Sequence, residues 1–163
     1  MILSRFLKPK LQPTTSEARQ SALQELETTD PALAEIARQD ADPMRRRAAL
    51  ERLADLDLLQ TIAREDADPA MQTAAQDRYQ TLLAGKIAES PMLTERLERL
   101  RHNPDPALAG FLAHHAAEPE LRRAALTLIE VETMLADIAA HDSHPEVRLA
   151  ALERVHNPNL LDQ

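Results

Sequence analysis

The sequence IARQDADP at residues 36–43 returns as IAREDADP at residues 62–69, with a single position changed. Prolines in similar surroundings recur along the chain at Pro43, Pro69, Pro119 and Pro145. The first two lie 26 residues apart, the last two also lie 26 residues apart, and 50 residues separate the two pairs. A unit of about 26 residues therefore recurs, and one irregular unit occupies the gap.

Each of these prolines begins the same pattern of residues. The four segments read PMRRRAALERL, PAMQTAAQDRY, PELRRAALTLI and PEVRLAALERV, and each has two alanines five and six residues after the proline. A shorter apolar run precedes every proline. Proline is tolerated in the first turn of a helix because its missing N–H would have no intrahelical partner there. Asp42 and Asp68 directly before the proline can cap the free amides, so each unit is predicted to be a helical hairpin.

The composition indicates the same fold class. The chain of 163 residues has no cysteine, no tryptophan and only three aromatic side chains, while eleven prolines and only two glycines punctuate it. Aliphatic residues and alanine must therefore form the core, and hairpin turns between strands lack the glycines they favour. These features favour an all-α fold.

One side of each second helix is predicted to be its core face, because apolar residues recur there with helical periodicity. The predicted core residues are Leu50, Leu53, Met71, Tyr79, Leu121, Leu126, Ile129, Val147, Leu152 and Val155. The paired alanines let adjacent helices approach closely. Hairpins this short cannot bury their own apolar faces, so neighbouring hairpins are expected to stack around one continuous core.

The pattern Asp–x–Asp–Pro followed by hydrophobic–Arg–x–Ala–Ala–Leu resembles the short HEAT-like repeats of bacterial proteins, over residues 15–157. The resemblance implies a right-handed α-solenoid of stacked helical hairpins. It also implies a ladder between turn aspartates and basic residues early in the second helices. The ladder residues would be Asp40, Arg46, Asp66, Arg122, Asp142 and Arg148.

Two of the ladder pairs are complete in the sequence. Asp40 would pair with Arg46, and Asp142 with Arg148, whereas Asp66 faces Gln72 and Arg122 faces Ala116. RFLKPK near the start, followed by short HEAT-like units, is also similar to the N-terminal region of large proteobacterial proteins that bear a domain of unknown function. That second resemblance implies no activity.

We expect a single domain over residues 1–163. Its predicted segments are an N-terminal cap at 1–14, a partial repeat at 15–29, repeats at 30–55, 56–85, 86–103 (irregular), 104–131 and 132–157, and the start of a truncated unit at 158–163. No polar capping repeat is expected over the last apolar face. Such an uncapped end favours dimers without biological meaning.

The outward positions of the second helices are the best candidates for a ligand surface. They are Arg47, Glu51, Thr73, Asp77, Arg123, Thr127, Leu149 and Glu153. Mixed charges favour a protein or peptide partner, because extended solenoid surfaces bind such partners. An ordinary solvated face explains the same residues about as often.

Other function classes are less well supported. No nucleophile elbow, phosphate-binding loop or zinc-protease helix is present, so we expect no enzyme activity and no cofactor. The metal-ligating candidates His115, His141 and His144 lack a ligand spacing typical of zinc, and no metal site is expected. A formal charge of −8 disfavours nucleic acid. A HEAT-like DNA-repair module and a purely structural spacer stay open as alternatives.

The chain is expected in the cytoplasm. It has no segment long and apolar enough for a membrane span or a signal peptide, and it has no cysteine for disulfides. The N-terminal segment MILSRFLKPK combines an apolar stripe with basic residues. It is predicted to cover the first repeat, with partner binding as the alternative role.

Overall fold

The computed structural model describes residues 28 and 30–160. All regular structure in this part of the chain is helical, which confirms the predicted all-α class. Contacts divide the chain into two compact units, Met1–Leu53 and Ala54–Gln163. The single domain over residues 1–163 stays a prediction. The N-terminal cap at 1–14 and the partial repeat at 15–29, apart from residue 28, lie outside the described residues.

The described part of the first unit is one helical hairpin. Helix α2 spans Pro31–Gln39 and packs against α3, which spans Pro43–Leu50. The Asp42 side chain accepts a hydrogen bond from the backbone N–H of Met44, which caps α3 as the sequence predicts. Leu33 of α2 and Leu50 of α3 are fully buried.

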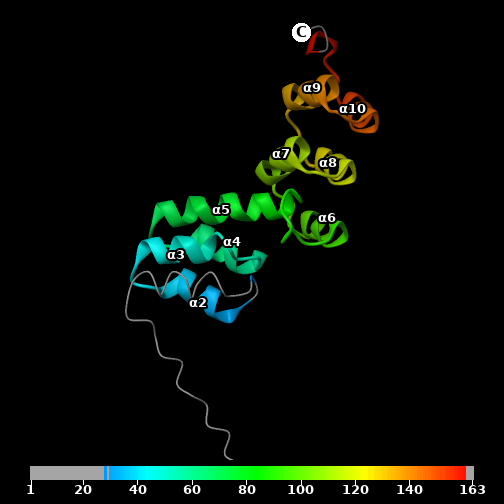
Figure 1. The fold of residues 1–163 in the computed structure, drawn as a ribbon. Coiled ribbons are helices and arrows are strands. Elements are labelled where there is room, and N and C mark those ends of the chain that lie inside the picture. The colour runs from blue at the N-terminus through cyan, green and yellow to red at the C-terminus, as the bar shows by residue number, and fades with distance from the viewer. Residues whose placement is uncertain (1–27, 29, 161–163) are drawn as a thin grey trace, which may run out of the picture. The chain divides into compact units, whose positions relative to one another are not determined.

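The second unit contains the remaining helices. They are α4 (Leu56–Glu65), α5 (Pro69–Leu83), α6 (Leu93–His102), α7 (Pro106–His115), α8 (Pro119–Leu126), α9 (Glu132–His141), α10 (Pro145–Leu152) and the 3-10 helix η1 (Pro158–Leu160). Helices α4 and α5, α7 and α8, and α9 and α10 pack as hairpins (Figure 1). All four anchor prolines therefore begin second helices, as predicted.

Successive hairpins of the second unit also pack on one another. Helix α7 contacts α9, and α8 contacts α10, so first helices lie beside first helices and second beside second (Figure 1). The second alanine of each pair is fully buried in α5, α8 and α10, where Ala75, Ala125 and Ala151 show no exposed surface. Their small side chains allow this close approach.

The C-terminal part of α5 takes the position of a first helix for the irregular unit. Helix α5 has 15 residues and ends shortly before Gly85, whereas α8 and α10 have eight each. Helix α5 packs against α7, and α6 packs against α8. The end of α5 and the whole of α6 thus precede the α7–α8 hairpin as a first and a second helix. Residues 86–92 form the turn between them.

Helix α6 keeps the 26-residue register although it lacks the proline. It begins at Leu93, 26 residues before Pro119, and its Arg96 lies 26 residues before Arg122. The register is therefore continuous from α6 to α10.

Most predicted core residues are buried, with two exceptions at one end of the second unit. Leu121, Leu126 and Ile129 are at most 3% exposed. In α10, Leu152 is 43% exposed. Val155, just after this helix, is half-buried. The core prediction is wrong for Leu152. The equivalent residue Leu126 in α8 is buried where α10 packs against α8, whereas among the described helices no later second helix packs against α10.

Candidate functional site

All eight predicted outward residues are exposed. They are Arg47, Glu51, Thr73, Asp77, Arg123, Thr127, Leu149 and Glu153. Helical periodicity determines this exposure, because these positions lie opposite the core face of each second helix. The exposure is as predicted, whereas the role of these residues in binding stays a prediction.

Ion pairs organise part of this surface. In the first unit, Arg47 and Glu51 pair along α3 at 3.1 Å. In the second unit, the Nη1 atom of Arg123 on α8 lies 3.4 Å from Oε2 of Glu146 on α10. Because the second pair joins successive second helices, the outward surfaces of α8 and α10 lie next to each other.

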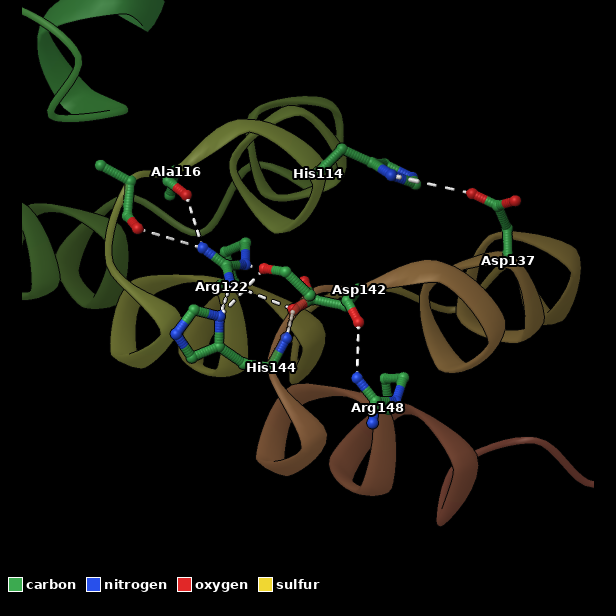
Figure 2. A network of polar contacts seen from close by, with 9 residues as sticks. His114, Ala116, Arg122, Asp137, Asp142, His144 and Arg148 are labelled. Atoms are coloured by element: carbon green, nitrogen blue, oxygen red, sulfur yellow. Dashed lines mark hydrogen bonds and ion pairs between the residues drawn. The ribbon is translucent and has the colours of Figure 1, made fainter.

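Arg122 is a buried side chain of α8 that makes five hydrogen bonds. It is 6% exposed, and its Nε and Nη2 atoms donate to the two carboxylate oxygens of Asp142 at 2.8 and 3.0 Å. Nη1 donates to the carbonyl oxygens of Ala116 and Ala117, and Nη2 also donates to Nδ1 of His144 (Figure 2). A guanidinium has five N–H groups, and these five contacts use all of them.

The Asp142 carboxylate is held ionised by this arrangement. Burial acts to raise its pKa, but hydrogen bonds from Arg122 and from the backbone N–H of His144 outweigh burial and lower the pKa below its ordinary value. Asp142 comes from the turn of the α9–α10 hairpin, whereas Arg122 comes from α8. The bidentate pair therefore joins two successive hairpins.

Arg96 makes the equivalent connection one hairpin earlier, and the sequence analysis missed it. This side chain of α6 is 4% exposed and binds both carboxylate oxygens of Glu118 at 2.8 and 2.5 Å. It also donates to the carbonyl oxygens of Pro91 and Leu83. The hydrogen bond from Arg96 lowers the pKa of Glu118, although burial opposes this shift. Counting back 26 residues from Arg122 would have found Arg96.

The predicted ladder takes a different form in the structure. Arg148 donates to the backbone carbonyl oxygen of Asp142 at 2.8 Å, while the carboxylate that was expected to bind Arg148 is bound by Arg122. Asp40 pairs with Arg45, the residue before the predicted Arg46.

The residue three positions after the start of a second helix contacts a carbonyl oxygen instead. Gln72 donates to the carbonyl oxygen of Asp66, as Arg122 does to that of Ala116. Each of these carbonyls belongs to the residue that ends a first helix. In both hairpins, this side chain therefore donates a hydrogen bond to the C-terminal end of the first helix, where carbonyl oxygens lack intrahelical partners.

A cleft of about 220 Å³ opens between the α7–α8 and α9–α10 hairpins, beside this network. Asp137 lines it, and the Asp137 carboxylate lies 3.9 Å from Nδ1 of His114 and 3.1 Å from Nδ1 of His141 (Figure 2 draws the first contact). Arg122 and Asp142 also line the cleft. Because all N–H groups of Arg122 already have partners, Arg122 offers no free guanidinium donor to a ligand there.

The three histidines considered as metal ligands have separate surroundings. The ring of His115 packs on Phe111 with centroids 4.7 Å apart, and burial, aided by Lys86, lowers its pKa. His141 contacts Asp137, and His144 contacts Arg122. Within the described residues, no group of three or more histidine, aspartate or glutamate side chains is arranged to hold a metal ion.

Comparison with known proteins adds no further constraint. No family model matches the chain, and searches of curated proteins and of solved structures found no significant match. Among the described helices, none has the length and apolar character needed to cross a membrane.

Proposed function

We propose that this chain is a non-catalytic protein-binding scaffold, built as a right-handed α-solenoid of HEAT-like repeats. It binds a protein or peptide along the outward surface of its second helices, needs no cofactor and acts in the cytoplasm. The absence of cysteine fits a reducing compartment.

The observation that carries the proposal is the ion pair between Arg123 and Glu146. It joins the exposed surfaces of the second helices α8 and α10, so that charged and polar side chains from the last two hairpins form one outward strip. Thr127, Leu149 and Glu153 lie on the same helices and are also exposed. Mixed charge with a few apolar side chains complements a protein surface better than a polyanion.

Affinity capture from a cell extract tests the proposal with two matched double variants. Arg47→Glu/Arg123→Glu reverses charges on second helices, whereas Arg38→Glu/Arg64→Glu reverses exposed charges in the last turns of the first helices α2 and α4. We expect the first variant to lose a specific protein that the wild type and the second variant retain. Circular dichroism must show equal helicity for all three proteins.

Two outcomes would overturn the proposal. Equal loss of the protein from both variants would show a general effect of charge instead of a role for the outward surface. Binding to duplex DNA that falls steeply with salt concentration would favour the nucleic-acid module instead.

A further inference from the structure

The cleft between the α7–α8 and α9–α10 hairpins has one charge in its lining that no ion pair with Arg122 neutralises. The guanidinium of Arg122 and the carboxylate of Asp142 neutralise each other through two hydrogen bonds of 2.8 and 3.0 Å. The remaining charged side chain of the lining is Asp137, because its other ionisable members are the imidazoles of His114 and His141. With neutral imidazoles, the lining therefore carries a single net negative charge.

Hydrogen-bond acceptors are left over in this cleft, whereas guanidinium donors are not. Nδ1 of His141 lies 3.1 Å from Oδ1 of Asp137 and 3.0 Å from the backbone carbonyl oxygen of the same residue, so this nitrogen carries a proton. Nδ1 of His114 lies 3.9 Å from Oδ2, which is too far for a hydrogen bond. Within the described residues, Oδ2 of Asp137 therefore has no hydrogen-bond donor.

The position of Asp137 makes this acceptor accessible to a ligand. Asp137 lies on α9 and His114 on α7, and their side chains point toward each other from the two hairpins (Figure 2). The Asp137 side chain is 57% exposed. The cleft volume of about 220 Å³ is below the roughly 300–1,000 Å³ of sites for drug-sized ligands. The cleft therefore suits a cationic group of about the size of one side chain.

We infer that this cleft binds an alkylguanidinium group, carried either by an arginine side chain of a polypeptide or by a free small molecule. The planar group donates two parallel hydrogen bonds to the Asp137 carboxylate and stacks on the imidazole ring of His114. An ammonium group is a compact, strongly hydrated charge and gains less from such a site. The cleft is separate from the outward strip and does not depend on the proposed function.

Titration of the isotope-labelled full chain with Nα-acetyl-arginine amide, followed by NMR, tests the inference. The blocked ends leave the guanidinium as the only charge of this probe, and Nα-acetyl-citrulline amide is the matched uncharged probe of nearly the same shape. At constant ionic strength, we expect saturable amide shifts at Ala113, Ile138 and Ser143 with the arginine probe and none with the citrulline probe. Because one exposed ion pair contributes little free energy, we expect a dissociation constant on the order of millimolar.

Asp137→Asn and Glu120→Gln in the full chain provide matched variants for this titration. Each removes one negative charge from an exposed side chain, but Glu120 lies in the first turn of α8 and does not line the cleft. We expect Asp137→Asn to raise the dissociation constant at least about fivefold and Glu120→Gln to change it less than about twofold, since only Asp137 accepts hydrogen bonds from the guanidinium. The amide spectra of the two variants also show whether they are folded.

A third probe distinguishes the two sources of the guanidinium. Propylguanidinium is the arginine side chain without a peptide backbone. Saturable binding of the blocked arginine supports an arginine of a polypeptide as the ligand, whereas saturable binding of propylguanidinium alone supports a free small molecule.

Three results would contradict the inference. They are the absence of saturable shifts with both guanidinium probes, equal responses to the arginine and citrulline probes, and equal effects of the Asp137→Asn and Glu120→Gln substitutions. Binding of Nα-acetyl-lysine amide as tight as that of the arginine probe would overturn the assignment to a guanidinium.

Discussion

A single glycine, Gly85, shapes the connection between α5 and α6. Gly85 directly follows Ala84, the C-cap residue of α5, and has a φ of +74°, in the left-handed region that residues other than glycine rarely adopt. A Cβ atom built at this position would lie 2.1 Å from Nη1 of the buried Arg96. Gly85 is therefore required both by its backbone conformation and by the close approach of the guanidinium.

Gly85→Ala is expected to lower the free energy of unfolding by about 2 kcal/mol or more, because left-handed backbone alone costs roughly 1–2 kcal/mol. Urea denaturation measures the change. Gly110→Ala is the matched control, since Gly110 lies inside α7 and its added Cβ would meet only the flexible end of Met134 at 3.3 Å. Equal destabilisation by the two substitutions would contradict the role given to Gly85.

Arg122→Met tests the buried guanidinium that binds Asp142. Its removal leaves the carboxylate of Asp142 buried without its cation, which costs about 3–5 kcal/mol for a buried pair. Arg123→Met, next to it, breaks only the exposed pair with Glu146 and should cost less than about 1 kcal/mol. Thermal and urea unfolding of the two variants give this comparison, and similar losses would show that Arg122 contributes no more than a surface residue.

At the scale of helices, the sequence predicts where most second helices begin, because a helix start depends on local chemistry. The anchor prolines correctly predict where α3, α5, α8 and α10 begin, because proline favours the first turn of a helix locally. A side-chain cap from the preceding aspartate is added only at α3 and α5. The start of α6 is not marked in this way, since Leu93 stands where the other second helices have proline.

The exposure of the predicted binding residues is a local feature of the sequence, whereas the ion pairs between hairpins are not. Exposure of the outward residues follows from helical periodicity, and the structure agrees. The pairs of Arg96 with Glu118 and Arg122 with Asp142 join residues 22 and 20 positions apart in different hairpins. Such pairs depend on how neighbouring hairpins pack, which the pattern within one repeat does not specify.

The contact between α6 and the α7–α8 turn should make stability depend on pH. The pKa of Glu118 is lowered in the folded protein, so the stability it contributes is present above its unfolded pKa and is lost as pH falls through its folded pKa. Glu118→Gln should therefore lower the melting temperature clearly at about pH 7, and its effect should shrink as the pH falls below the unfolded pKa of a glutamate towards about pH 3.

Glu120→Gln is the control for this measurement, because Glu120 is an exposed acidic residue in the first turn of the same helix. Its effect on the melting temperature should be small at both pH values. A Glu118→Gln effect that is as large at about pH 3 as at neutral pH would exclude the carboxylate as its cause.

At the scale of the whole molecule, acidic side chains outnumber basic ones. Its formal net charge is −8, and the exposed arginines Arg47 in the first unit and Arg123 in the second each pair with a nearby glutamate. The buried arginines are also paired, so they hold hairpins together and contribute little to an external field. The second helices therefore present a mixed polar surface, on which the proposed function rests.

Site-specific photo-crosslinking in a cell extract tests this surface most directly. Exposed threonines allow a matched comparison, since Thr73 and Thr127 belong to second helices or their caps, whereas Thr61 and Thr133 belong to the first helices α4 and α9. With a photoreactive residue at each position in turn, we predict that Thr73 and Thr127 crosslink a common protein and that Thr61 and Thr133 do not. Crosslinks to that protein from Thr61 and Thr133 alone would place the partner on the first helices and contradict the account.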